Sequence, residues 1–193
     1  MALDDTAVVI PGTGYLFLNQ TPGAAAPALT PTALNALDLT QATLATGWDN
    51  VGHTAREDNV SYTREGGDTN TVGTWQVPSL RTTVDPVTRG LSINALQVGN
   101  ETFTLYFGGG DDSGTGVFDE PDTPVAQDRA LFLVLVDGAA RLGLYVPKAS
   151  IIGSDAIEVD PEDFLQLNLG ATFVKLGSNP IARWIHPALG VGA

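Results

Sequence analysis

The sequence predicts a mainly β protein, an antiparallel β-sandwich or β-barrel with one short helix and an extended loop. Short apolar runs recur along the chain with Gly, Pro, Asn and Asp between them, which is the pattern of many strands joined by turns. Phe164–Val174 alternates strictly between apolar and small or polar residues, as a half-buried strand does. The length of 193 residues is close to that of one domain, so one β-domain is expected.

The first 45 residues predict two strands and an extended arm. Ala7–Ile10 and Tyr15–Leu18 are short apolar runs, and the turn Pro11–Gly14 separates them. Thr21–Thr32 is rich in Pro, Ala and Thr, which favours an extended arm. Ala33–Ala45 has the leucines of a weak helix, but its threonines and irregular spacing favour a loop.

The next part of the chain predicts a hairpin with a long connection. Asn59–Thr63 alternates as a half-buried strand, and the polar, Gly-rich Arg64–Thr74 predicts a flexible loop or hairpin tip. Trp75–Val77 and Leu80–Val84 return to strand character, although Pro78 interrupts them. Leu91–Val98 predicts a further strand or the approach to a helix.

Asn100–Phe107 is ambiguous between strand and helix. Asn100 suits an N-cap, Glu101 suits the first turn and Gly108 suits the C-terminal cap, so a short helix is predicted. Gly108–Pro124 follows as an acidic, Gly-rich loop.

The last third predicts a central hairpin. Arg129–Asp137 is a continuous apolar strand covered on both faces, and Arg141–Val146 returns after a turn at Gly138–Ala140. Ala156–Val159 predicts a short strand. The β-domain is predicted over residues 1–178, including the extended arm 20–47, with a C-terminal tail over 179–193.

In Phe164–Val174, the apolar residues share one face and the polar residues the other. The apolar face is Leu165, Leu167, Leu169, Ala171 and Phe173, and the opposite face is Gln166, Asn168, Gly170 and Thr172. This pattern predicts a strand with its apolar face in the core and its polar face towards water.

Charge and composition exclude several function classes. The net charge is −13, which argues against a protein that grips nucleic-acid phosphates. The absence of cysteine excludes disulfides and thiolate sites. No apolar run approaches the ~20 residues of a membrane helix, and the first residues predict no signal peptide. Seven of the nine basic residues are Arg, which fits either subunit contacts or GC-rich codon usage.

No catalytic, cofactor or metal site is predicted. Gly12–Gly14 lacks the rest of a nucleotide-binding fingerprint, and His53 and His186 have no nucleophile motif beside them. The acidic loop carries possible calcium ligands, but their spacing fits no calcium loop and a solvated loop is favoured. These residues are Asp111, Asp112, Asp119, Glu120 and Asp122.

A series of short motifs, in order, carries a family resemblance. They are Ala7–Gly14, Val51–Thr54 followed by Glu57 and Asp58, Arg64–Gly67, Gly73–Trp75, Ser79–Thr83 and Leu105–Gly109. Their order and spacing resemble the major tail tube proteins of long-tailed (siphovirus) bacteriophages, especially of actinobacterial hosts. The resemblance covers most of residues 1–175.

The resemblance implies a structural, non-enzymatic subunit of the virion tail, assembled in the host cytoplasm. It implies hexameric rings that stack into a tube, a continuous inner β-barrel, and passage of genome DNA through the bore without specific binding. The implied partners are other copies of the chain and tail proteins such as the tape measure and the tail terminator. By position, the residues of the inter-ring loop are Arg64, Glu65, Gly66, Gly67, Asp68, Asn70 and Thr74.

The strand pattern adds a hypothesis about the bore. The polar residues Gln166, Asn168 and Thr172 are candidates for bore-lining positions, because neutral side chains do not hold DNA phosphates. Two other functions stay open at this point. One is a calcium-dependent immunoglobulin-like adhesion or carbohydrate-binding module, and the other is a β-sandwich hydrolase with paired carboxylates.

Overall fold

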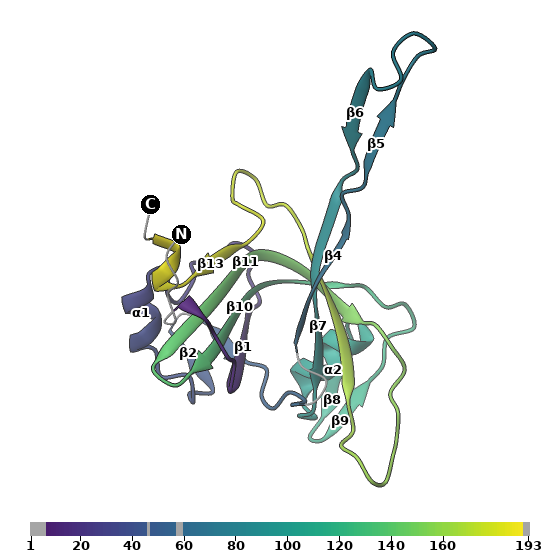
Figure 1. Ribbon diagram of the computed structural model, residues 1–193. Coiled ribbons are helices and arrows are strands. Elements are labelled where there is room, and N and C mark those ends of the chain that lie inside the picture. Colours follow the sequence, from purple (N-terminus) through teal and green to yellow (C-terminus); the bar gives the residue numbers. More distant parts are fainter. Residues whose placement is uncertain (1–6, 46, 57–59, 191–193) are drawn as a thin grey trace.

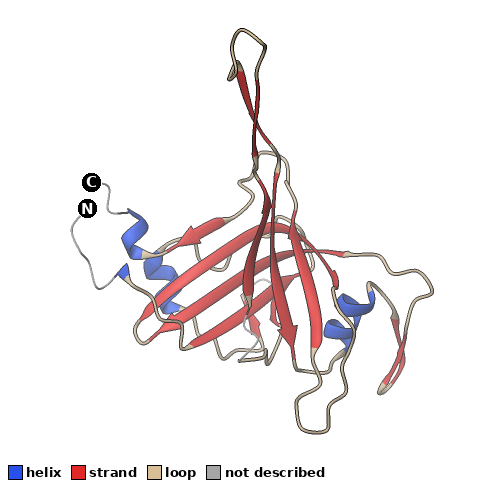
Figure 2. Cartoon of the chain, turned by 45° about the vertical axis from the view of Figure 1, so that its right-hand side comes forward, coloured by secondary structure: helices blue, strands red, loops and turns tan. Residues whose placement is uncertain are grey.

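The computed structural model describes residues 7–45, 47–56 and 60–190, and it confirms a mainly β, antiparallel fold (Figures 1 and 2). The helical elements are α1 (Pro31–Ala36), α2 (Asn100–Phe107) and the 3-10 helix Pro187–Gly190. The strands are β1 (Thr13–Asn19), β2 (Thr43–Leu44), β3 (Trp48–Asn50), β4 (Ser61–Gly66), β5 (Thr69–Val72), β6 (Arg81–Val84), β7 (Val87–Ala95), β8 (Asp111–Gly114), β9 (Val117–Asp119), β10 (Gln127–Asp137), β11 (Ala140–Gly153), β12 (Leu167–Phe173) and β13 (Arg183–Ile185).

One curved sheet of nine strands forms the body. Its order is β2-β3-β1-β10-β11-β12-β7-β4, and β13 pairs with β11 beside this path. The long β11 pairs with β10 along most of its length and with β12 over its last residues, Ala149–Gly153. Because one strand serves both halves of the sheet, the sheet arches, as Figure 1 shows.

A connecting segment, residues 51–56, bridges the two halves of the arch. The Val51 N–H donates to Leu16 O on β1 at 2.9 Å, and the Leu96 N–H donates to His53 O at 2.8 Å. An isolated bridge between Thr54 and Ala95 adds a contact to β7. These contacts join β1 to β7 across the arch, so the body resembles a partly closed barrel.

Two apolar cores lie on opposite faces of the sheet, because neighbouring side chains of a strand point to opposite faces. Leu131 and Leu133 of β10 enter the α2-side core, where Leu105 of α2 is fully buried. Phe132 and Val134 enter the α1-side core. The prediction of a β10 strand buried on both faces is confirmed for residues 130–134, and the hairpin with β11 is confirmed as well.

The extended arm packs on its own sheet and contains the helix α1. Thr30 caps α1 with its Oγ1, which accepts from the Ala33 N–H at 3.2 Å, and Pro31 occupies the first turn. Leu34 of α1 is fully buried in the α1-side core. The preference for a loop over Ala33–Ala45 was therefore wrong for its first residues, because burial of Leu34 stabilises a helix that propensity alone does not.

The predicted helix Asn100–Phe107 is confirmed. The Thr102 hydroxyl, on the buried side of α2, accepts from the Gly99 N–H at 3.0 Å and donates to backbone oxygens before the helix. Gly108 ends the helix with φ of +67°, the left-handed conformation that glycine favours.

Two predicted strands are not formed. In Ala7–Ile10, Val8 and Ile10 are exposed, and the ladder of β1 begins only at Thr13, which pairs with Val136 near the end of β10. Ala156–Val159 belongs to the exposed connection between β11 and β12. Both runs are apolar, but neither has a neighbouring strand with which to pair.

Other boundaries also differ from the prediction. Asn59 lies outside the described residues, and β4 is exposed along its whole length instead of half-buried. Trp75–Val77 forms part of a turn, not a strand, and β6 begins only at Arg81. The acidic loop Gly108–Pro124 contains the short hairpin β8–β9. The alternating segment is confirmed over Leu167–Phe173, which forms β12 with its odd-numbered residues buried. Its predicted start was wrong, because residues 164–166 precede the strand and Phe164 is 76% exposed.

Candidate assembly surfaces

A long two-part hairpin projects from the body. Its base is the ladder of β4 and β7, and its outer part is the separate ladder of β5 and β6. Figure 1 shows β5 and β6 rising well above the body. At about 3.3 Å per residue, the chain from Gly67 to Trp75 extends it by roughly 25 Å beyond β4.

Two glycines form the joint between the parts. Gly66 and Gly67 have φ values of +77° and +83°, and a Cβ on Gly66 would lie 2.3 Å from the carbonyl oxygen of Pro86. Side chains are therefore excluded by conformation and by space. Beyond the joint, the Asp85 N–H donates to Asp68 O at 2.9 Å and starts the outer ladder.

The tip of the hairpin is a closed turn that displays an indole. The Thr74 N–H donates to Val77 O at 2.8 Å, and the Val77 N–H donates back to Thr74 Oγ1 at 3.1 Å. Trp75 lies between these two residues and is 101% exposed. The hydrogen-bonded turn presents a large apolar side chain in a fixed backbone frame.

The seven residues predicted for the inter-ring loop lie along one side of this hairpin. Arg64, Glu65 and Gly66 end β4, and Gly67 completes the joint. Asp68 starts the outer ladder, Asn70 is in β5 and Thr74 begins the tip. The segment is thus mostly paired strand, and the alternative of a flexible loop is wrong. The polar pattern of this segment does not show that it pairs with β6 and β7, which follow the tip in the chain.

A polar surface covers the outer face of β12, β7 and β4. Cross-strand neighbours place Thr172 beside Gly90 and Gly90 beside Thr63, while Gly170 is beside Ser92. Gly90 is obligatory here, since a Cβ would lie 2.7 Å from Ala171 O. These small residues line a shallow groove, to which Glu65, Arg89 and Asp155 also contribute.

The predicted bore residues lie on or next to this surface. Asn168 and Thr172 are on the polar face of β12, and Gln166 immediately precedes the strand, half-buried. Sequence reasoning missed Ser92 and Gly90 of β7. The alternation of Thr88, Gly90, Ser92 and Asn94 with Leu91, Ile93 and Ala95 is the signal that could have found them.

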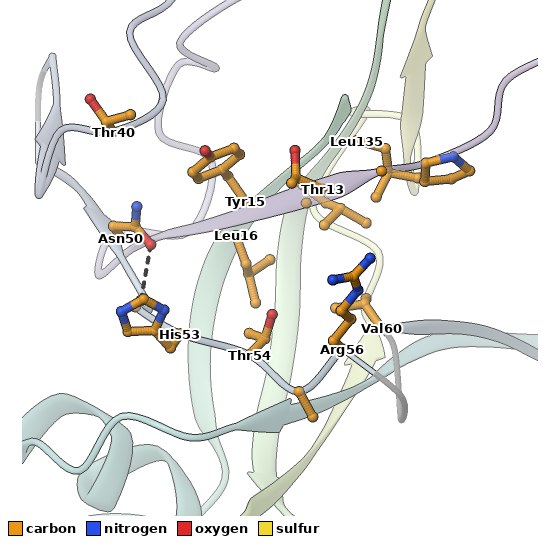
Figure 3. A pocket seen from close by; sticks show the side chains of 16 residues that line it. Thr13, Tyr15, Leu16, Thr40, Asn50, His53, Thr54, Arg56, Val60 and Leu135 are labelled. Atoms are coloured by element: carbon orange, nitrogen blue, oxygen red, sulfur yellow. Dashed lines mark hydrogen bonds between the residues drawn. The ribbon is translucent and has the colours of Figure 1, made fainter. Parts of the chain in front are cut away.

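A separate cleft of about 910 Å³ lies between β1 and the connecting segment (Figure 3). Leu16 and Leu135 contribute apolar surface, and His53 and Arg56 contribute imidazole and guanidinium groups. Tyr15 lies beside the cleft, but its ring packs against the α1-side core. The wall beside His53 is braced by the Gly52 N–H, which donates to Asn50 Oδ1 at 2.9 Å.

Among the described side chains, the residues weighed for metal binding or catalysis are not gathered into a site; the side chains of Asp111 and Asp112 lie outside that part. Within the described part of the chain, no group of three or more His, Asp or Glu side chains could hold a metal ion. His53 is exposed, whereas His186 is buried and accepts from the Ala188 N–H through Nδ1. No helix within the described ranges is both long and apolar enough to cross a membrane.

A sheet with a projecting hairpin and extended polar and apolar surfaces defines a protein suited to contacts with other chains. Comparison with known proteins identifies its class: the chain belongs to the phage tail tube protein family, whose sequence model matches residues 1–193. It is 34% identical over 194 residues to the major tail protein Gp23 of Mycobacterium phage D29, covering 98% of this chain and 96% of that one. The identity and coverage are the same for Gp23 of Mycobacterium phage L5. The protein is therefore a structural component of a phage tail and not an enzyme.

Proposed function

We propose that six copies of this chain form a ring, and that rings stack head to tail into a tube that conducts genome DNA. The observation that carries this proposal is the projecting hairpin, which extends roughly 25 Å beyond β4 and ends in exposed apolar side chains. A contact between a projection and a different surface of the next copy does not close on itself, so it generates a filament.

The outer hairpin provides the contact between rings. Its exposed large apolar residues are Val72, Trp75, Val77, Leu80 and Val84, with relative exposures from 45% to 101%. A group of such residues on a slender hairpin is a typical interaction surface, because isolated subunits gain by removing it from water.

The polar surface of β12, β7 and β4 lines the bore. Six copies of a chain with a net charge of −13 repel DNA, and most residues at this surface are small and neutral, with Arg89 as the one basic residue that lines the groove in the described part of the chain. DNA then slides without specific binding. Screening over roughly 8 Å at physiological salt keeps the repulsion short-ranged.

At its two ends the tube requires other partners. A tape measure protein in the bore during assembly and a tail terminator on the last ring are the proposed ones, with assembly in the host cytoplasm. The family membership supports contacts with further tail components in general.

Removal of the outer hairpin tests the stacking role. Replacing residues 69–84 by Asn-Gly joins Asp68 to Asp85, whose backbones already share a hydrogen bond, through a turn suited to a two-residue hairpin. We expect a folded subunit with an unchanged melting temperature that forms no tubes in negative-stain electron microscopy. The matched control is Val159→Ser, which removes an 84% exposed valine outside the hairpin and should leave tubes intact. Tubes of normal length from the shortened variant would refute the proposal.

A further inference from the structure

We infer that Trp75 of one subunit inserts into the cleft between β1 and the connecting segment of a second copy. This inference rests on the proposed function and adds to it the receiving surface of the hairpin. It assigns a role to two features that the fold itself leaves unexplained, a fully exposed indole and an unfilled cleft.

The indole is presented for binding. Trp48 is 0% exposed and Trp184 is 43% exposed, whereas Trp75 is 101% exposed. Burying a tryptophan removes a large apolar area from water, and tryptophan is enriched among residues that dominate interfaces. Because the turn from Thr74 to Val77 is already hydrogen-bonded, little backbone entropy is lost when the tip binds.

The cleft has the chemistry that an indole needs. Leu16 and Leu133, at 2% and 4% exposure, and the half-buried Leu135 offer apolar surface beneath it. The guanidinium of Arg56 can stack on an indole face in a cation–π contact. Figure 3 shows His53, Thr54 and Arg56 along one side of the cleft and Leu16 on the side of β1 that faces them.

The tip can enter such a cleft without burying a charge. Residues 69–80 contain no Asp, Glu, Lys or Arg, although 16% of the whole chain is charged. The volume of about 910 Å³ exceeds that of one side chain, so it admits the turn on both sides of Trp75. An uncharged, apolar tip and a cleft with apolar surface are complementary.

The positions of Trp75 and of the cleft within one chain indicate that the tip of a second copy occupies the cleft. In Figures 1 and 2 the outer hairpin rises from the top of the body, and Figure 1 shows β1 in the lower part of the sheet. A tip at one end cannot fold back to a cleft at the other. Between copies, the same placement gives a head-to-tail contact that repeats along a filament.

Photo-crosslinking from position 75 tests the contact. The photoreactive amino acid p-benzoylphenylalanine replaces Trp75, tubes are assembled from a mixture of isotope-labelled and unlabelled chains, and crosslinked peptides are mapped by mass spectrometry. The first basic residue of the chain is Arg56, so one tryptic peptide, 1–56, carries both walls of the cleft. We expect crosslinks between labelled and unlabelled chains at Thr13–Leu16 or Gly52–Arg56. The matched control is the same substitution at Trp184, which should give no crosslink at these positions.

Two substitutions provide a second measurement. Trp75→Ala should reduce the yield of sedimentable tubes at least tenfold, and Trp75→Phe should restore most of it, because an aromatic ring still fills the cleft. Crosslinks only to other surfaces or within one chain, or normal tube yield from Trp75→Ala, would overturn the inference while leaving the tube itself intact. If the unmodified chain forms no tubes at all, the proposed function fails instead.

Discussion

Tyr145 links the extended arm to the sheet at the scale of a single residue. Its hydroxyl donates to Ala24 O at 2.7 Å, and its ring packs edge-on against Trp48, whose Nε1–H donates to Ala25 O at 2.9 Å. Burial raises the pKa of Tyr145 above its usual value of 10, and this effect outweighs the opposing field of Arg183.

The raised pKa predicts a loss of stability at high pH. Above pH 10 the unfolded chain releases the Tyr145 proton while the folded protein retains it, so the free energy of unfolding falls as the pH rises. Tyr145→Phe should cost about 1 kcal/mol at neutral pH through the lost hydrogen bond. Between pH 8 and 10.5, the free energy of unfolding of this variant, measured with urea, should fall less steeply than that of the wild type. Parallel pH curves for the two proteins would contradict this assignment.

Leu133 tests the α2-side core. It is 4% exposed at the centre of β10, so Leu133→Asp would bury an unpaired carboxylate and cost on the order of several kcal/mol, enough to prevent folding. Circular dichroism and thermal melting check the outcome, with Val159→Asp at an exposed position as control. A soluble Leu133→Asp protein that melts cooperatively would place this strand outside the core.

At the scale of the elements, the polar surface of β12, β7 and β4 depends on how these strands pair. Each strand supplies only two or three small polar residues, and the register sets them side by side in rows, such as Thr172, Gly90 and Thr63. The opposite face of β4 is anchored by Tyr62, which packs edge-on against Phe173 and also contacts Trp184. The base of the projecting hairpin is thereby held in place.

A positive charge on this surface should slow the release of DNA through the tube. Thr172→Lys places a cation on the exposed face of β12, and we expect tubes to form but DNA release to slow, most strongly at low salt, because each phosphate contact adds a salt-dependent affinity. Release kinetics measured by dye fluorescence at two salt concentrations check this expectation. The control is Thr32→Lys, on the exposed side of α1. Equal slowing in both variants would exclude Thr172 from the bore.

At the scale of the whole molecule, the C-terminal residues complete the body. Arg183–Ile185 pairs with Gly143–Tyr145 of β11, and Ile185 is 5% exposed in the α1-side core. The predicted boundary at residue 178 stays a prediction. The contacts of β13 nevertheless show that residues beyond it pack on the sheet.

Truncation of one side chain measures this contribution. Ile185→Ala should lower the free energy of unfolding by about 2–4 kcal/mol, as large-to-small changes in a core do. Leu189→Ala, at a 64% exposed position, should change it by less than about 0.5 kcal/mol. Chemical denaturation of both variants gives the comparison. Similar small losses would mean that β13 is only loosely attached.

The sequence by itself determined the features that depend on local pattern. The alternation in β12, the continuous apolar run of β10, its tight turn to β11 and the capped helix α2 all follow from residues close together in the chain. The ordered series of short motifs likewise determined the family, which the comparisons confirm.

Only the tertiary structure decided the features that depend on distant partners. Val8 and Ile10 look like strand residues but have no strand beside them, whereas the polar residues of β5 become a strand because β6 lies opposite. The helix α1 forms despite its weak local preference, because Leu34 is buried in the α1-side core. The cleft beside Arg56 exists only where β1 approaches a segment about 40 residues further along the chain, a closeness that no local pattern encodes.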